Sequence, residues 1–142
     1  WNGSCHVHEQ FSLKKILDLK KKYPEAKIIA HPECKKVLLD IADFIGSTSA
    51  LLKYVQRSDY AEFIVATESG ILHEMKKDCP GKLFIPAPPE DSTCACNECN
   101  FMRMNNLQKL YDCLLNESPD IKLPREIVEK AYKPIKRMLD LS

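Results

Sequence analysis

Three cysteines lie within one short stretch, Cys94-Ala95-Cys96-Asn97-Glu98-Cys99. Thiolates this close in sequence suit coordination of a soft metal ion, or exchange between thiol and disulfide. The spacing fits neither a zinc ribbon, which uses two separated Cys-x-x-Cys knuckles, nor the bacterial ferredoxin run. We expect Cys5, which ends an expected strand far upstream, to converge on the same point.

The cysteine content of the whole chain bears on its compartment. Seven cysteines, an odd number, occur in 142 residues, and no secretory pattern opens the chain. This usage favours metal binding or redox chemistry in a reducing compartment over a disulfide scaffold, and it predicts a cytoplasmic protein. Cys34, Cys79 and Cys113 are expected to be ordinary thiols, with Cys113 in the core on the apolar side of its helix. The start at Trp1 is interpreted as that of a segment from a longer protein.

Two histidines have neighbours that favour chemistry. His8 follows Cys5 by three residues, and His31 opens the sequence His31-Pro32-Glu33. Imidazole titrates near neutral pH, so a histidine beside a carboxylate or a thiol suits proton transfer. His6 and His73 lack such neighbours, and no chemical role is expected for them.

Two polar stretches open expected helices. Gly46-Ser47-Thr48 offers backbone N–H groups, two hydroxyls and the positive end of a helix dipole, which together suit a phosphate or a carboxylate. An ordinary N-cap uses the same residue types, and on these residues alone it is the favoured interpretation. Thr67-Glu68-Ser69-Gly70 has the same two interpretations.

The elements that position these residues alternate between strand and helix. Strands are expected at residues 27–30, 62–66 and 83–85, and helices at 12–22 (with Ser12 as N-cap), 35–44, 48–55, 70–77, 105–115 and 124–141. Such alternation predicts a short parallel sheet covered by helices, a three-layer α/β/α fold followed by C-terminal helices. Ligands of parallel sheets bind beyond the carboxyl ends of the strands, which is where the polar stretches fall.

The chain changes character after the third expected strand. Three prolines and an acidic stretch lead from there into the cysteine cluster. We therefore divide the chain into an α/β domain at residues 1–88 and a second part at residues 89–142. Pro134 is expected to kink the last helix.

Composition argues against two classes of partner. The 21 Lys and Arg residues nearly balance the 20 Asp and Glu residues and form no basic stripe, so no nucleic-acid partner is expected. The apolar runs are strand-sized, far short of the ~20 residues that a membrane span needs, so no membrane partner is expected.

Several blocks, read in their order and spacing, resemble the quinolinate synthase family over essentially the whole chain. The blocks are Trp1-x-Gly3-x-Cys5-x-Val7-His8-x-x-Phe11, Tyr23-Pro24-x-Ala26, His31-Pro32-Glu33, Ala42-Asp43-x-x-Gly46-Ser47-Thr48-Ser49, Ala66-Thr67-Glu68-x-Gly70, Cys96-x-x-Cys99-x-x-Met102-x-Met104-Asn105-x-Leu107 and Ile135-x-x-Met138-Leu139. Together they are highly specific, and they correspond to the C-terminal half of the enzyme.

The resemblance implies an activity and a cofactor. Quinolinate synthases condense iminoaspartate with dihydroxyacetone phosphate, losing phosphate and two waters, to make the pyridine precursor of NAD. They form three similar α/β domains with pseudo-threefold symmetry, and each domain supplies one cysteine to a [4Fe–4S] cluster. The fourth iron stays open as a Lewis acid. The implied partners are the N-terminal part of the same enzyme and, functionally, L-aspartate oxidase or aspartate dehydrogenase.

Residue by residue, the resemblance implies two cluster ligands and a set of cavity residues. Cys5 matches the second cluster ligand and Cys99 the third. His8, His31 and Glu33 match residues that line the active cavity, where they are suited to proton transfer and, for His31 and Glu33, to holding substrate carboxylates.

The resemblance also bears on the polar loop and on a second cysteine. Ser47 and Thr48 match an anion-binding loop, which changes the favoured interpretation of this stretch from a cap to a substrate site. Cys96 matches a cysteine that in some members forms a disulfide with a neighbour.

The chain departs from the family pattern in ways that limit what it can do alone. The first cluster cysteine and the opposite wall of the cavity belong to an N-terminal part that is absent from this sequence. Asn100 stands where many members have proline, and the Cys94-Ala95-Cys96 spacing is tighter than in some bacterial members. Since two thiolates hold a [4Fe–4S] cluster poorly, we expect the isolated segment to be inactive.

Two interpretations from other classes compete with the enzyme. One is a small zinc- or partner-binding module that uses Cys94, Cys96 and Cys99, with His8 as a further ligand. The other is a thiol–disulfide switch at Cys96 and Cys99. Neither accounts for the polar stretches that follow the expected strands.

Overall fold

The computed structural model describes residues 3–91 and 98–142 of the chain. It contains two compact units, one that runs to Arg103 and one at Met104–Ser142, and each is described by itself. The division expected after residue 88 stays a prediction about the longer enzyme. Within the described residues, no helix is both long and apolar enough to cross a membrane.

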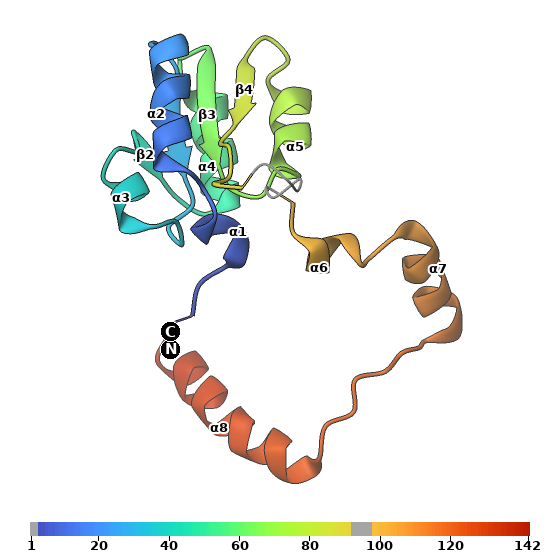
Figure 1. Cartoon of the computed structure of the whole chain (residues 1–142). Coiled ribbons are helices and arrows are strands. Elements are labelled where there is room, and N and C mark those ends of the chain that lie inside the picture. The colour runs from blue at the N-terminus through green and yellow to red at the C-terminus, as the bar shows by residue number, and fades with distance from the viewer. Residues whose placement is uncertain (1–2, 92–97) are drawn as a thin grey trace. The chain divides into compact units, whose positions relative to one another are not determined.

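The first unit is built on a parallel sheet (Figure 1). Its strands are β1 (Lys27–Ala30), β2 (Phe44–Ile45), β3 (Glu62–Ala66) and β4 (Leu83–Pro86), in the order β2-β1-β3-β4. Every pairing is parallel, and the last residues of the central strands, Ala30 and Ala66, are partners. The expected parallel sheet is confirmed, as are the three strands expected from the sequence.

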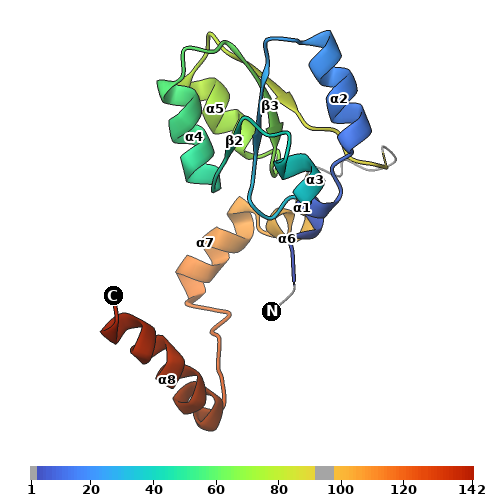
Figure 2. The ribbon, with the colours of Figure 1, turned by 90° about the vertical axis from the view of Figure 1, so that its left-hand side faces the viewer.

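Helices cover both faces of this sheet, as Figure 2 shows for α2 on one side and α4 and α5 on the other. The helices of this unit are α1 (His6–Glu9), α2 (Leu13–Lys22), α3 (Lys36–Leu39), α4 (Thr48–Arg57), α5 (Ile71–Asp78) and α6 (Asn100–Arg103). Successive strand residues face opposite sides of a sheet. In β3, Ile64 packs with the α1–α3 side and Phe63 with the α4–α5 side, which gives two core clusters and the predicted three layers.

The helix expected at residues 35–44 is wrong beyond its first turn, because α3 ends at Leu39. Asp43 explains the difference. Its backbone N–H donates to Ile28 O over 2.7 Å, and its Oδ2 accepts from Ile28 N–H over 2.8 Å. These bonds align the chain with β1, and Phe44 then continues as β2.

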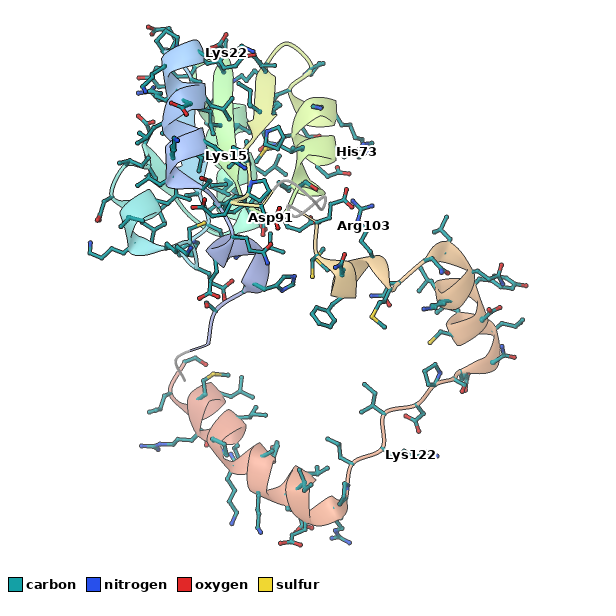
Figure 3. The ribbon with its side chains drawn as sticks, in the orientation of Figure 1. Lys15, Lys22, His73, Asp91, Arg103 and Lys122 are labelled. Carbon is teal, nitrogen blue, oxygen red and sulfur yellow. The ribbon has the colours of Figure 1, made fainter. Side chains whose placement is uncertain are left out.

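Of two local expectations near the N-terminus, one is wrong and the other, Ser12 as the N-cap residue of α2, is confirmed in position only. Cys5 does not end a strand; it is the N-cap residue of α1. Ser12 precedes α2 as expected, but its hydroxyl donates to Glu90 Oε2 over 2.9 Å and makes no capping bond. This contact, and the hydrogen bonds from Lys15 Nζ to the Pro89 and Glu90 carbonyl oxygens at 2.9 and 2.8 Å, fasten the segment after β4 along the start of α2 (Figure 3).

The second unit contains α7 (Leu107–Asn116) and α8 (Arg125–Asp140), which confirms both expected helices. Pro134 lies inside α8. Neither helix has a buried residue in this chain, so the expectation that Cys113 lies in a core is wrong. The exposed large apolar side chains of the two helices are Leu107, Leu110, Tyr111, Leu114, Leu115, Ile127, Val128, Tyr132, Ile135, Met138 and Leu139.

Candidate active site

The loops after β1 and β3 meet at the carboxyl edge of the sheet. From β1 the chain continues to β2 on one side, and it then returns past β1 to form β3 on the other side. Parallel sheets bind ligands at such a switch point, since the two loops diverge there and leave a crevice. A cavity of about 500 Å³ lies at this edge. Its lining includes Cys5, His8, His31, Thr48, Thr67 and Cys99.

His8 is held at both of its ring nitrogens. It projects from the short helix α1 and is buried. Its Nδ1 lies 3.0 Å from Glu33 Oε2, and its Nε2 lies 3.1 Å from Thr67 Oγ1. One face of the ring stacks on His31, with centroids 4.1 Å apart and planes 12° from parallel. Residues from α1, from the loop after β1 and from the loop after β3 therefore fix this imidazole in place.

His31 has a defined tautomer when it is neutral. The backbone N–H of Glu33 donates to His31 Nδ1 over 3.3 Å, so Nδ1 is an acceptor and the ring proton resides on Nε2. Burial and the neighbouring His8 lower the pKa of His31 more than the Glu33 carboxylate raises it. At neutral pH, His31 is thus an uncharged ring that can donate a hydrogen bond from Nε2.

The Glu33 carboxylate lies beside both imidazoles. Besides its contact with His8, its Oε2 lies 3.6 Å from His31 Nδ1. The Glu33 side chain is 48% exposed, whereas that of His8 is 8% exposed. A carboxylate open to solvent beside two ordered histidines can pass a proton between solvent and the cavity. The predicted catalytic residues His8, His31 and Glu33 are therefore in mutual contact.

Cys5 and Cys99 line the same cavity. Both are half-buried and pack against the core cluster on the α1–α3 side of the sheet. The backbone N–H of Cys99 donates to Glu68 Oε1 over 3.4 Å, which ties the Cys99 segment to the loop after β3. Cys94 and Cys96 lie outside the described residues. The zinc-module and disulfide-switch interpretations depend on these two cysteines and therefore stay predictions.

Cys34 and the two remaining histidines stand apart from this chemistry. Cys34 is buried, its thiol donates to Ala66 O over 3.4 Å, and burial raises its pKa to about 11. It is therefore a protonated thiol at neutral pH. His73 is exposed on α5 (Figure 3), and His6 packs edge-on to Phe101 with centroids 5.8 Å apart.

The two hydroxyls of the predicted anion-binding loop differ in their surroundings. Ser47 Oγ accepts from Ala50 N–H over 3.3 Å and caps α4, while Thr48 lines the cavity. Gly46 allows this close turn, since a Cβ there would lie 2.9 Å from the Ala50 Cβ. Thr48, at the first turn of α4, is thus the residue of the pair that faces the candidate site.

Sequence reasoning missed the roles of Thr67 and Glu68. It treated them as an ordinary cap or an anion cradle, whereas Thr67 contacts His8 and Glu68 contacts the Cys99 segment. Gly70, the N-cap residue of α5, has no side-chain capping bond. Their position in the sequence could have indicated a role in the site, because both residues directly follow a central strand at the switch point.

The fold and the site define an α/β domain in which two cysteine and two histidine side chains line one cavity. A sequence model of the quinolinate synthetase A protein family matches residues 1–140, and the chain belongs to that family. This confirms the resemblance found in the sequence blocks.

Curated relatives are similar over the whole chain. The quinolinate synthases of Chloroherpeton thalassium, Thermosynechococcus vestitus and Trichodesmium erythraeum are 58%, 57% and 59% identical over 142 residues. In each case the match covers 100% of this chain and 44% of the relative. The chain therefore spans less than half the length of the curated relatives that it matches.

Proposed function

We propose that this chain supplies two cluster ligands and one wall of the active site of a quinolinate synthase. The whole enzyme would condense iminoaspartate with dihydroxyacetone phosphate to form quinolinate for NAD biosynthesis in the cytoplasm. One observation carries the proposal: the thiols of Cys5 and Cys99 line the same cavity as His8 and His31. Membership of the quinolinate synthetase A protein family supports this choice of reaction.

The donor set fits part of a [4Fe–4S] cluster. Thiolates are the ligands of such clusters, and two half-buried cysteines border one cavity here. Cys5 and Cys99 would each hold one iron, and a third cysteine would come from the N-terminal part of the enzyme. When bound, a cluster with three thiolate ligands supplies an open iron that acts as a Lewis acid.

The side chains around the thiols would bind and protonate substrate. His31, neutral with its proton on Nε2, donates a hydrogen bond to a substrate oxygen. His8 and Glu33 share a proton across 3.0 Å, and the exposed carboxylate exchanges it with solvent. Thr48, at the N-terminus of α4, offers a hydroxyl and the helix dipole to a substrate carboxylate or phosphate, while Ser47 keeps the helix end in place.

The exposed apolar surface of the second unit would be covered by the rest of the enzyme. The apolar side chains of α7 and α8 are exposed here, and a hollow of about 920 Å³ beside α7 is lined by residues such as Leu107 and Leu110. Contiguous apolar faces mark surfaces that another part of the protein covers. We propose that the second unit packs on the rest of the enzyme, and that L-aspartate oxidase or aspartate dehydrogenase supplies the iminoaspartate.

Anaerobic reconstitution with iron and sulfide, with and without the upstream half, tests the proposal. Visible absorption by the cluster is expected with both halves present, together with quinolinate formation from the two substrates. The absorption should be lost on Cys5→Ala or Cys99→Ala and kept in Cys113→Ala, a matched control in the second unit. A cluster that forms equally well without Cys99 would contradict the proposal, and the chain alone is expected to be inactive.

A further inference from the structure

Three side chains at the carboxyl edge of the sheet, two of which line the cavity, offer ligand atoms for a single metal ion. Cys5, His8 and Glu33 each present one such atom, and the three atoms lie within 4.8 Å of one another. They come from two places in the fold, the start of α1 and the loop after β1. This group of ligands differs from the proposed cluster ligands, with which it shares only Cys5. It includes no residue of the cysteine-rich stretch at residues 94–99.

The spacing is close to that of a zinc site. In tetrahedral zinc sites with bonds of about 2.0–2.3 Å, neighbouring ligand atoms lie roughly 3.2–3.7 Å apart. His8 Nδ1 and Glu33 Oε2 are already 3.0 Å apart. The Cys5 sulfur lies within 4.8 Å of the ligand atoms that His8 and Glu33 offer, so it needs to move by only about 1 Å to join them.

The second nitrogen of His8 is held as it is in zinc proteins. A zinc-bound histidine donates its other N–H to an oxygen, which fixes its tautomer and its ring orientation. Thr67 Oγ1 stands 3.1 Å from His8 Nε2 and can accept this bond. The lone pair on Nδ1 then faces the Glu33 carboxylate, and two acceptors that close require a proton or a cation between them.

Charge and access also favour a divalent cation. A thiolate and a carboxylate together carry two negative charges, which balance a 2+ ion. Among residues 3–91 and 98–142, only His8 and His31 lie within ion-pairing distance of the Glu33 carboxylate, so no lysine or arginine competes for it. The half-exposed Glu33 side chain gives an ion a route from solvent. One cysteine, one histidine and one carboxylate are all zinc ligands, and three protein ligands leave a fourth position for water.

We propose that Cys5, His8 and Glu33 bind one zinc ion when the chain carries no iron–sulfur cluster. A second consequence rests on the proposed function. Because the Cys5 thiolate belongs to both ligand sets, zinc and the cluster exclude each other, so zinc bound to the incomplete protein blocks cluster assembly.

The metal-free 142-residue chain tests the zinc site directly. We expect one Zn²⁺ per chain in a chelator-competition titration, and Co²⁺ substitution should give thiolate charge-transfer and tetrahedral ligand-field bands. Cys5→Ala should abolish binding. Glu33→Gln, a conservative change at an exposed position that leaves the fold intact, should weaken it at least tenfold, and Thr67→Val should weaken it about 10–100-fold.

A matched variant separates this site from the cysteine-rich stretch. The combined change Cys94→Ser, Cys96→Ser and Cys99→Ser should leave zinc affinity within twofold of the unchanged chain. Loss of zinc in this triple variant, or full affinity in Glu33→Gln, would overturn the proposal.

The same variants distinguish the zinc site from the cluster. With the upstream half present, Glu33→Gln should keep cluster absorption and resist inhibition of assembly by zinc. Cys99→Ala should lose cluster absorption and keep zinc. Zinc binding that follows this pattern without any cluster would uphold the zinc site and refute the proposed function. Cluster assembly that depends on Cys5 and Cys99, with no zinc binding that depends on Glu33, would refute the zinc site alone.

Discussion

The carboxylate of Glu68 joins the loop after β3 to the backbone of Cys99, a residue 31 positions further along the chain. Its Oε1 accepts from Cys99 N–H over 3.4 Å, and its Oε2 accepts from Gly70 N–H over 2.7 Å. The preceding residue, Thr67, contacts His8. One dipeptide therefore sets the positions of a candidate cluster ligand and of a candidate acid–base residue.

Removal of the Glu68 side chain should loosen the Cys99 segment. In Glu68→Ala, the amide of Cys99 loses its acceptor, and we expect faster hydrogen exchange there and several-fold faster alkylation of its thiol. Global stability should fall by about 1–3 kcal/mol, the range for the two hydrogen bonds that this carboxylate accepts. Mass spectrometry of exchange and alkylation measures both effects. Glu74→Ala, which removes another carboxylate at the same cavity, is the control and should leave Cys99 unchanged.

Gly70→Ala should reproduce that local effect with little change in stability. A Cβ at this position would lie 2.7 Å from Glu68 Oε2, the mobile end of a side chain, so the carboxylate has to move away. The Gly70 backbone is helical (φ −57°, ψ −30°), so alanine fits there without strain and restricts the unfolded chain, a gain of about 0.4–1 kcal/mol. We expect faster exchange at Cys99 and a free energy of unfolding within about 1 kcal/mol of the parent chain.

Gly81→Ala is the matched control, since a Cβ there meets no atom within 4 Å. If hydrogen exchange at Cys99 is the same in Gly70→Ala and Gly81→Ala, then the Glu68 carboxylate does not hold the Cys99 segment.

The sequence predicted the fold better than the contacts within the site. Buried apolar runs such as 62–66 and the helices between them follow from local patterns, which is why the sheet could be predicted. Phe44 falls within the helix expected at residues 35–44 because its spacing from Val37 and Ile41 is helical. Its place in β2 depends on Asp43 bonding to Ile28, a contact that no local pattern encodes.

The identities of the site residues could be predicted from the sequence, but the contacts between them could not. The resemblance pointed to His8 and Glu33, yet their 3.0 Å contact joins residues 25 positions apart. The contact of His8 with Thr67 spans 59 positions. Such pairs arise only when the parallel strands bring their loops to one edge of the sheet. The order β2-β1-β3-β4, which places the loops after β1 and β3 side by side, was not available from periodicity.

Asp43 should give the first unit a stability that depends on pH. Burial raises its pKa, but hydrogen bonds from Lys27 Nζ at 2.9 Å and Ile28 N–H at 2.8 Å outweigh this and hold the pKa below its ordinary 3.8. The unfolded chain then binds a proton before the folded chain does. The stabilisation is therefore complete well above pH 3.8 and is lost as pH falls through the lower folded value.

Urea unfolding of Asp43→Asn at neutral and acid pH measures this contribution. At pH 7 the variant should be less stable by about 1–2 kcal/mol, because hydrogen bonds to a charged group are lost. The difference should shrink as the pH falls below 3.8, where the stabilisation from the parent carboxylate is progressively lost. Asp40→Asn is the control, since Asp40 forms an exposed ion pair with Lys36, one helical turn away on the surface. A pH-independent difference would show that the Asp43 charge is not what stabilises β2.

Cys34 should be the least reactive of the cavity-side thiols despite its place beside the site. Its side chain is 5% exposed, and burial raises its pKa from the ordinary 9.0 to about 11. The thiolate fraction near pH 8 is therefore about 100-fold lower than in an unfolded peptide. Iodoacetamide labelling of the metal-free chain, resolved by mass spectrometry, should modify Cys34 at least 100-fold more slowly than the same chain in denaturant. Cys113, half-exposed on α7, is the control and should react at similar rates in both states. Rapid labelling of Cys34 under native conditions would mean that the loop after β1 opens readily, and the fixed contacts of His31 and Glu33 would then not persist in solution.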